Sequence, residues 1–474
     1  LGRLTKSLFG GGEGRARWSI MRAANKSSRS AALEAEDAAR RAAAALIQKR
    51  FRDQTFLHRD VGPTVMCLKG GARALWGSIN FGRARQSSFL ACSDTTSAPL
   101  IAHIFQLHWS LPTPEMILSV TGGAQDFELT PRLQSLFTNG LTHVAGRSNV
   151  WIITGGTDSG VMKLVGNAMA SVGHKNPIIG IAPYMATNGR DLLNGCHGDT
   201  VKYGGVAPAG RQGAPLNPNH SHFLLVDAGT QRSPFGTEIG LRNELESYFR
   251  KTKRTPLVLL VVQGGPGTMT TVAATAKAGD PVVILVDSGG AATAIAAYCE
   301  GGGSLDAVRE TVGEKFADEK KAAQLQQIYE LHKASGNTLL TFFSIDSVDA
   351  DLSASLLDAI IKVHTAGADK ESLAGGTAVG GRAELGVDAT AVTSSAGFTS
   401  PRAEVSERSS HAEASQSNGR ERRAVASHSV AVRMLMLAVN WNLPENASRI
   451  IGRLGTGVGY RVAVKEALQR ALFL

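Results

Sequence analysis

The fold is decided by two stretches, Trp151-Ile-Ile-Thr-Gly-Gly-Thr-Asp-Ser-Gly160 and Pro256-Leu-Val-Leu-Leu-Val-Val-Gln-Gly-Gly-Pro-Gly-Thr268. Each is an apolar run, typical of a buried strand, that ends in a turn of glycines and hydroxyl residues and continues into a helical pattern. A helix after such a turn presents unpaired backbone N–H groups and its positive dipole end, which suits phosphate. A third turn of this kind, Ile117-Leu-Ser-Val-Thr-Gly-Gly123, lies upstream. One such turn is often only a tight connection, but two in one α/β unit favour a nucleotide-like ligand.

Apolar and helical segments alternate along the middle of the chain. Strands are predicted at 116–120, 150–153, 177–182, 221–226, 257–262 and 281–286, and helices near 94–109, 131–145, 160–172, 237–249, 268–278 and 291–299. This alternation predicts an α/β fold with a Rossmann-like parallel sheet and helices on both faces. Ligands bind such sheets beyond the carboxyl ends of the strands, where all the glycine turns are placed.

A chain of 474 residues is too long for one typical domain. We expect a basic, partly disordered tail, the α/β domain, a helical extension, a disordered insertion rich in Ser, Ala, Gly and Thr, and the start of a helical repeat region. These segments are 1–60, 61–304, 305–365, 366–427 and 428–474. Residues 188–219, polar and rich in Gly and Pro, are predicted to form a loop that covers the crevice.

The net charge of +10 lies mostly before residue 60, so it describes the tail rather than the fold, and we expect no nucleic-acid partner. Four scattered cysteines without a CxxC pair indicate neither a zinc site nor a disulfide framework. A reducing, intracellular setting is the simplest interpretation. The chain has no apolar run of about 18 residues, so nothing in it is expected to span a membrane.

Several single residues have two interpretations. Asp199, Asp227 and Glu238 lie at or near predicted turns or strand ends and could hydrogen-bond a ribose, although capping or solvated roles are commoner. Arg242, on the helix after the Phe235 turn, could reach a phosphate, although from sequence alone a plain surface arginine is favoured.

No catalytic or metal-binding set stands out. His220 and His222 point the same way on a predicted strand, but no third metal ligand is apparent, so packing is favoured over a metal pair. A Gly-x-Ser-x-Gly elbow is absent, and we expect no metal site and no catalytic residue.

A basic helix in the tail contains Ile47-Gln-Lys-Arg-Phe-Arg52, which resembles the first half of an IQ motif, the helical segment that binds calmodulin. The later glycine and basic residue of that motif are missing, since Asp53 and Leu57 stand there. Calmodulin binding through Ile47, Gln48, Phe51 and Arg52 and a merely solvated basic helix both remain open.

Several long motifs in the right order resemble the melastatin-type transient receptor potential channels (TRPM). They are Ser119-Val-Thr-Gly-Gly-Ala-Gln-Asp-Phe127, Trp151 to Gly166, Pro218-Asn-His-Ser-His-Phe-Leu-Leu-Val-Asp227 and Gly264-Gly-Pro-Gly-Thr268. Met434-Leu-Met-Leu-Ala-Val-Asn-Trp-Asn442 resembles the opening of that family's ankyrin-like repeats. The similarity spans roughly Gly77 to Ala297 and resumes near Val430.

The resemblance implies a SLOG-type domain in the cytosolic N-terminal region of a homotetrameric, calcium-permeable cation channel. Some family members bind ADP-ribose-type nucleotides in this cleft. Carried over by position, the ligand-binding residues are Thr154, Gly155, Gly156, Thr157, Asp158, Ser159, Gly160, Phe235, Arg242, Gly264, Gly265, Pro266, Gly267 and Thr268. The pore would lie beyond Leu474, so the chain is expected to be a fragment that meets the membrane only through segments outside it.

Departures from the family pattern weaken the expected ligand site. Phe235 stands where the family has an aromatic residue that carries a hydroxyl group, so that hydroxyl is absent here. Ala228 replaces an acid, and Gly290 stands where ligand-binding members carry an arginine. One charged hydrogen bond, typically worth about 1.5–3 kcal/mol, is then lost.

Phosphoribohydrolases of the same domain class carry catalytic glutamates after the glycine turn. This chain has Met269-Thr-Thr-Val272 there, without a carboxylate for acid–base work on a glycosidic bond. The sequence therefore favours a non-enzymatic ligand-sensing region. The alternatives are a stand-alone cytoplasmic nucleotide-binding protein and a nucleotide hydrolase with an unrecognised residue set.

Overall fold

A computed structural model describes residues 67–69, 71, 73–82, 86–173, 176–204, 213–229, 235–345, 350–376 and 432–454. These residues fall into two units, of which the first contains residues 99–112 and the second contains the others. Helix α4 (Ala98–Leu107) supplies most of the described part of the first unit, where the Phe105 ring stacks on Trp109 at 4.3 Å.

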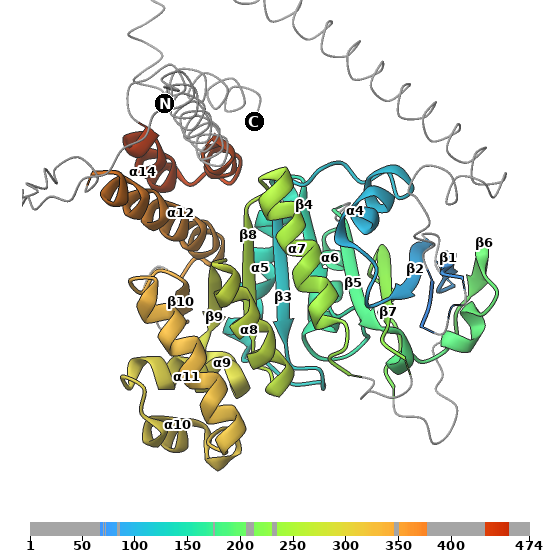
Figure 1. Ribbon diagram of the computed structural model, residues 1–474, viewed down its shortest axis with the longest axis horizontal. Coiled ribbons are helices and arrows are strands. Elements are labelled where there is room, and N and C mark those ends of the chain that lie inside the picture. The colour runs from blue at the N-terminus through green and yellow to red at the C-terminus, as the bar shows by residue number, and fades with distance from the viewer. Residues whose placement is uncertain are drawn as a thin grey trace, which may run out of the picture. The chain divides into compact units, whose positions relative to one another are not determined.

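The second unit is built on one sheet of ten strands in the order β10-β9-β8-β3-β4-β5-β7-β2-β1-β6 (Figure 1). The strands are β1 (Leu75–Asn80), β2 (Ser87–Ser93), β3 (Met116–Gly122), β4 (Val150–Thr154), β5 (Ile178–Pro183), β6 (His197–Lys202), β7 (His222–Asp227), β8 (Leu257–Val262), β9 (Val282–Leu285) and β10 (Leu340–Phe343). Every neighbouring pair from β10 to β2 is parallel, whereas β1 is antiparallel to β2 and parallel to β6. The predicted Rossmann-like α/β fold class is confirmed.

Helices lie on both faces of the sheet, and further helices pack on those helices. They are α5 (Pro131–Arg147), α6 (Gly160–Ser171), α7 (Ile239–Lys253), α8 (Pro266–Ala278), α9 (Gly290–Glu300), α10 (Leu305–Val312), α11 (Glu319–Ala334), α12 (Leu352–Gly376), residues 432–440 and α14 (Pro444–Leu454). Leu118 and Leu260 share one core with α5, α6 and α12, whereas Leu259 and Val261 share another with α8, α9 and α11. Figure 1 shows α7 and α8 in front of the sheet and α5 behind it.

Local sequence explains why these elements begin and end where they do. All six residues of β8 are apolar and buried, as expected for a parallel strand with helices on both faces. Helix α8 starts with Pro266, whose fixed φ suits the first helical position, and ends at Gly279 in the left-handed conformation. Asp318 caps α11 by accepting a 3.0 Å hydrogen bond from the backbone N–H of Lys321.

Three predicted segments differ from the structure. Strand β6 lies inside the predicted loop at 188–219, because an exposed edge strand reading His-Gly-Asp-Thr-Val-Lys has no apolar alternation. Strand β10 lies inside 305–365, where only helices are predicted, because four residues are too few for a clear period. Helix α12 continues through Gly376, past the predicted start of disorder at 366, in small residues without a hydrophobic period.

Other predicted segments lie outside the described residues. These are the tail with Ile47, Gln48, Phe51 and Arg52, most of the insertion at 366–427, and residues 455–474. The five-segment division of the chain stays a prediction. None of the described helices is long and apolar enough to cross a membrane.

Candidate functional site

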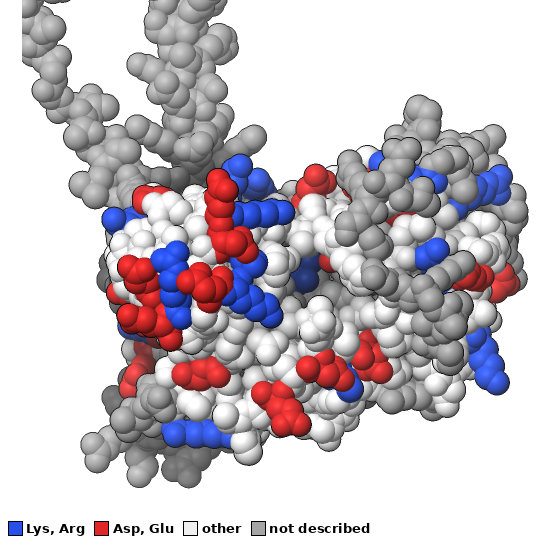
Figure 2. Space-filling model, turned by 90° about the horizontal axis from the view of Figure 1, so that it is seen from below, with Lys and Arg blue, Asp and Glu red and all other residues white. Residues whose placement is uncertain are grey.

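The candidate site lies where the chain order of the sheet reverses. Strands β4, β5 and β7 lie on one side of β3, and β8, β9 and β10 lie on the other. In open parallel sheets, ligands bind beyond the carboxyl ends of the strands at such a reversal. The three glycine turns follow β3, β4 and β8 at this end. Figure 2 looks onto it, and the surface is hollowed near the middle of the face.

The turn between β4 and α6 uses its polar groups internally. The buried Thr154 hydroxyl accepts a 2.9 Å hydrogen bond from the Gly156 N–H and lies 2.7 Å from His220 Nε2. The Asp158 carboxylate accepts a 2.7 Å hydrogen bond from the Asn217 amide. Residues 213–220 therefore lie against this turn, and its side chains position the backbone.

The N-terminus of α6 is already occupied by a carboxylate. Asp126 Oδ1 accepts a 2.9 Å hydrogen bond from the Gly160 N–H, and Oδ2 lies 2.8 Å from Lys163 Nζ. These contacts, with Lys163 first, hold the pKa of Asp126 below its usual value. Gly160 has φ +52, and a Cβ there would lie 1.8 Å from the Gly123 oxygen, so only glycine fits. A phosphate at this turn would compete with Asp126.

The turn between β8 and α8 is open by comparison. Its helix has no acidic residue in the first turn, Pro266 stands first, and no side chain caps it. Among the residues that the structure describes, the backbone N–H groups of Gly267 and Thr268 find no acceptor. The Thr268 hydroxyl donates to the carbonyl of Gly122 at 3.1 Å, which fixes the turn against β3. The N-terminus of α8 therefore keeps backbone N–H donors for an anion, whereas at α6 the Gly160 N–H already donates to Asp126.

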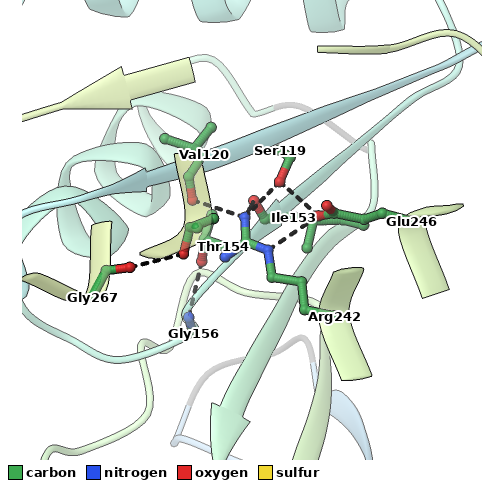
Figure 3. Close-up of polar contacts among 9 residues, drawn as sticks. Ser119, Val120, Ile153, Thr154, Gly156, Arg242, Glu246 and Gly267 are labelled. Carbon is green, nitrogen blue, oxygen red and sulfur yellow. Dashed lines mark hydrogen bonds and ion pairs between the residues drawn. The ribbon is translucent and has the colours of Figure 1, made fainter. Parts of the chain in front are cut away.

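Arg242 lies beneath these turns in a buried network (Figure 3). Its Nε donates to Glu246 Oε1 at 3.0 Å, and the two side chains are only 6% and 5% exposed. Its Nη2 donates to Ser119 Oγ (2.7 Å) and to the carbonyls of Val120 (3.1 Å) and Ile153 (3.2 Å). Ser119 in turn donates to Glu246 Oε1 at 2.6 Å. The surface position favoured by sequence alone is therefore wrong.

One terminal nitrogen of the Arg242 guanidinium remains available to donate hydrogen bonds to a ligand. Its Nη1 makes no hydrogen bond to any residue in the described part of the chain, and it is not fully buried. Arg242 and Thr268 both bind carbonyls near the carboxyl end of β3, at Val120 and Gly122. The structure thus brings a charged donor and an open helix N-terminus to the same strand end.

Two other predicted positions differ in character. The Phe235 side chain, which precedes α7, is 51% exposed. Gly290, the first residue of α9, has φ +61, and a Cβ there would lie 2.5 Å from the Gly264 oxygen. An arginine at 290 would strain this backbone, so restoring the charge needs more than one substitution.

Three other sequence candidates, His220, His222 and Asp227, make contacts that indicate structural roles. His220 is fully buried, and burial lowers its pKa to about 3. His222 Nδ1 lies 2.8 Å from the Ser221 hydroxyl. Asp227 accepts hydrogen bonds from the backbone N–H groups of Lys69 and Gly229, both at 2.9 Å, which is a capping role. Within the described residues, no cluster of three or more His, Cys, Asp or Glu could hold a metal.

The predicted site residues of the two turns differ in how open their helix N-termini are to a ligand. Thr154, Gly155, Gly156, Thr157, Asp158, Ser159 and Gly160 form the closed α6 turn, and Gly264, Gly265, Pro266, Gly267 and Thr268 form the open α8 turn. Sequence reasoning missed Asp126, Ser119 and Glu246. The i, i+4 spacing of Arg242 and Glu246 was the available signal for the ion pair.

The geometry defines a Rossmann-like α/β domain with an anion-suited site at the reversal of the sheet. Residues 87–342, more than half of the chain, match the family model described as "SLOG in TRPM", and the chain therefore belongs to this family. It is 34% identical over 330 residues, 61% of the chain, to "Transient receptor potential cation channel subfamily M member-like 2" of Nematostella vectensis.

Two mammalian relatives are also similar. The chain is 37% identical over 226 residues, 44% of its length, to subfamily M member 2 of Rattus norvegicus. It is 31% identical over 326 residues, 63% of its length, to subfamily M member 1 of Mus musculus. The alignments cover 21%, 15% and 20% of the three relatives, so the chain spans about a fifth or less of their length.

Proposed function

We propose that this chain is a regulatory region of a TRPM-type cation channel and that it senses an ADP-ribose-type nucleotide without converting it. The names of the three relatives described above, each a cation channel of subfamily M, support the channel context. The observation that carries the ligand proposal is the open N-terminus of α8 beside the free Nη1 of Arg242. A diphosphate binds there by charge and by backbone N–H donors.

The surroundings of the α8 turn support a binding role over catalysis. Thr270 and Thr271 donate to carbonyls of their own helix, each at 3.1 Å, and supply no acid or base. Glu246, the buried carboxylate of the Arg242 network, is ion-paired with Arg242. Glycosidic cleavage needs a free carboxylic pair, so a hydrolase is the weaker candidate.

The proposed affinity is modest because Gly290 supplies no charge. A bound phosphate then relies on Arg242 and on the N-terminus of α8, without the further arginine that the family resemblance implies. We infer that the ligand binds more weakly here than in a domain with both arginines.

The test is calorimetry of the 474-residue protein with ADP-ribose, comparing Gly267→Asp with Gly267→Asn. A Cβ at Gly267 meets no atom within 4 Å, and a carboxylate at a helix N-terminus is stabilising, so neither variant should unfold. The aspartate places a negative charge where the phosphate is proposed. Wild type and Gly267→Asn should bind, and Gly267→Asp should not. Equal heats from all three proteins would reject the site.

Phe235→Ala gives a second, independent probe of the same site. The exposed ring costs little stability to remove, and Val172→Ala at the C-cap of α6 is a matched control because Val172 is also exposed, at 49%. Weaker ADP-ribose binding in Phe235→Ala alone supports an aromatic contact with the ligand.

The wider context is also proposed. A homotetrameric channel would place this region on the cytosolic side, with the membrane reached through segments outside the chain. A stand-alone cytoplasmic nucleotide-binding protein is the alternative. Calmodulin binding through Ile47, Gln48, Phe51 and Arg52 stays a prediction, which a calmodulin titration of wild type and Phe51→Asp would test. Release of ribose phosphate or free base on incubation with ADP-ribose would favour the hydrolase.

A further inference from the structure

Glu238, the N-cap residue of α7, has a buried oxygen without a partner. Its Oε2 is buried and accepts no hydrogen bond from the residues that the structure describes. A buried carboxylate oxygen that has lost water and gained no donor is unfavourable, and such atoms in native proteins need an explanation. A donor supplied by a ligand is one explanation, provided that the atom lies at the ligand site.

The position of Glu238 meets that condition. It stands one helical turn before Arg242, whose backbone N–H donates to the Glu238 carbonyl at 2.9 Å. Residues four apart lie on the same side of a helix, about 5–6 Å apart. No described contact joins the two side chains within ion-pair distance, so each keeps unused capacity, the carboxylate as an acceptor and the guanidinium as a donor.

Glu238 and Arg242 favour different chemical groups of a ligand. A carboxylate repels phosphate, so the group that meets Glu238 must be a hydrogen-bond donor, while Arg242 takes the anion. A sugar phosphate carries both groups at this spacing, because its hydroxyls and its phosphate are attached to one small ring. Burial raises the pKa of Glu238, opposed by the backbone N–H groups of Glu238 and Gly236 and by Arg242, which fits a group that gains from a ligand donor.

Building on the proposed function, we propose that Glu238 accepts a hydrogen bond from a sugar hydroxyl of the ligand whose phosphate is bound by Arg242. Glu238 is then a specificity-determining residue that selects phosphorylated sugars with free hydroxyls over phosphates without them. An acceptor site of this kind discriminates strongly, because an analogue that lacks the hydroxyl leaves the carboxylate buried and unpaired.

The experiment is calorimetry of the full 474-residue chain with ADP-ribose, ribose 5-phosphate and inorganic pyrophosphate. Glu238→Gln should weaken binding of the two sugar phosphates about 10- to 100-fold, the loss expected for one charge-assisted hydrogen bond. Pyrophosphate, which lacks hydroxyls and is repelled by a carboxylate, should bind Glu238→Gln at least as tightly as wild type. Glu244→Gln is the matched control, because Glu244 is an exposed glutamate of the same helix.

Each result has one meaning. Unchanged ADP-ribose affinity in Glu238→Gln, or an equal loss for pyrophosphate, overturns the inference and leaves the proposed function intact. A loss confined to ADP-ribose, with ribose 5-phosphate unaffected, transfers the contact to the adenosine half of the nucleotide and overturns a general preference for sugar phosphates. If wild type binds no ADP-ribose, the proposed function fails first and the inference fails with it. Should Glu238→Gln not fold, Glu238→Asp keeps the charge, retracts the oxygen and carries the same expectations.

Discussion

The buried pair of Arg242 and Glu246 makes the sharpest prediction about stability. Arg242→Met keeps the side-chain volume but leaves the Glu246 carboxylate, 5% exposed, with the Ser119 hydroxyl as its remaining partner in the described structure. Breaking a buried ion pair by removing one member costs about 3–5 kcal/mol. Domains of this kind are stable by about 5–15 kcal/mol, so the variant should be close to the limit of folding.

The double variant separates the charge from the packing. When both members of a buried pair are replaced by apolar residues of similar volume, the change is often neutral. Arg242→Met with Glu246→Leu should therefore recover most of the loss, with a coupling of about 3 kcal/mol between the two sites. Two backbone carbonyls, those of Val120 and Ile153, still lose a donor, which limits the recovery.

Urea unfolding followed by circular dichroism measures these differences as shifts in midpoint at constant slope. Arg309→Met is the control, because the Arg309 side chain is 41% exposed in its pairs with Asp306 and Glu314. Exposed pairs contribute little, so this variant should resemble wild type. Energetic coupling between Arg242 and Glu246 is ruled out if Arg242→Met is as mild as Arg309→Met, or if the double variant loses the sum of the single losses. The same data show whether lost nucleotide binding in an Arg242 variant reflects binding or folding.

Three further predictions concern the turns. Burial lowers the pKa of His220 to about 3 in the folded protein, below the unfolded value near 6.5. Its contribution to stability is therefore complete above pH 6.5 and falls as the pH is lowered. In urea unfolding, lowering the pH from 7 to 5 should cost wild type about 2 kcal/mol more than it costs His220→Gln. Gly160→Ala should lose about 1–3 kcal/mol of stability because of its left-handed φ and the nearby Gly123 oxygen, and Gly265→Ala, with open space around the new Cβ, should melt near wild type. Asp126→Asn should leave ADP-ribose affinity unchanged, and a marked rise would move the phosphate to the α6 turn.

The sequence by itself determined most of the strands and helices between residues 116 and 300. Buried parallel strands such as β8 are continuous apolar runs, and the turns that follow them contain the glycines needed for tight backbone approach. Both signals are local, since they depend on neighbours in the chain and on periods of two or 3.6 residues. The strands and helices near the glycine turns could therefore be predicted to within a few residues, whereas the exposed edge strand β6, without such a period, could not.

Only the tertiary structure decided which turn is open. Asp126 closes the N-terminus of α6 from 34 residues upstream, and Glu246 meets Ser119 across 127 residues of sequence. No local pattern encodes such pairings, because they follow from the order of the strands and the faces on which the helices pack. The role of Arg242 changed for the same reason, since its burial depends on strands β3 and β4 meeting α7. Sequence supplied the chemical groups, and long-range packing selected the few that remain available to a ligand.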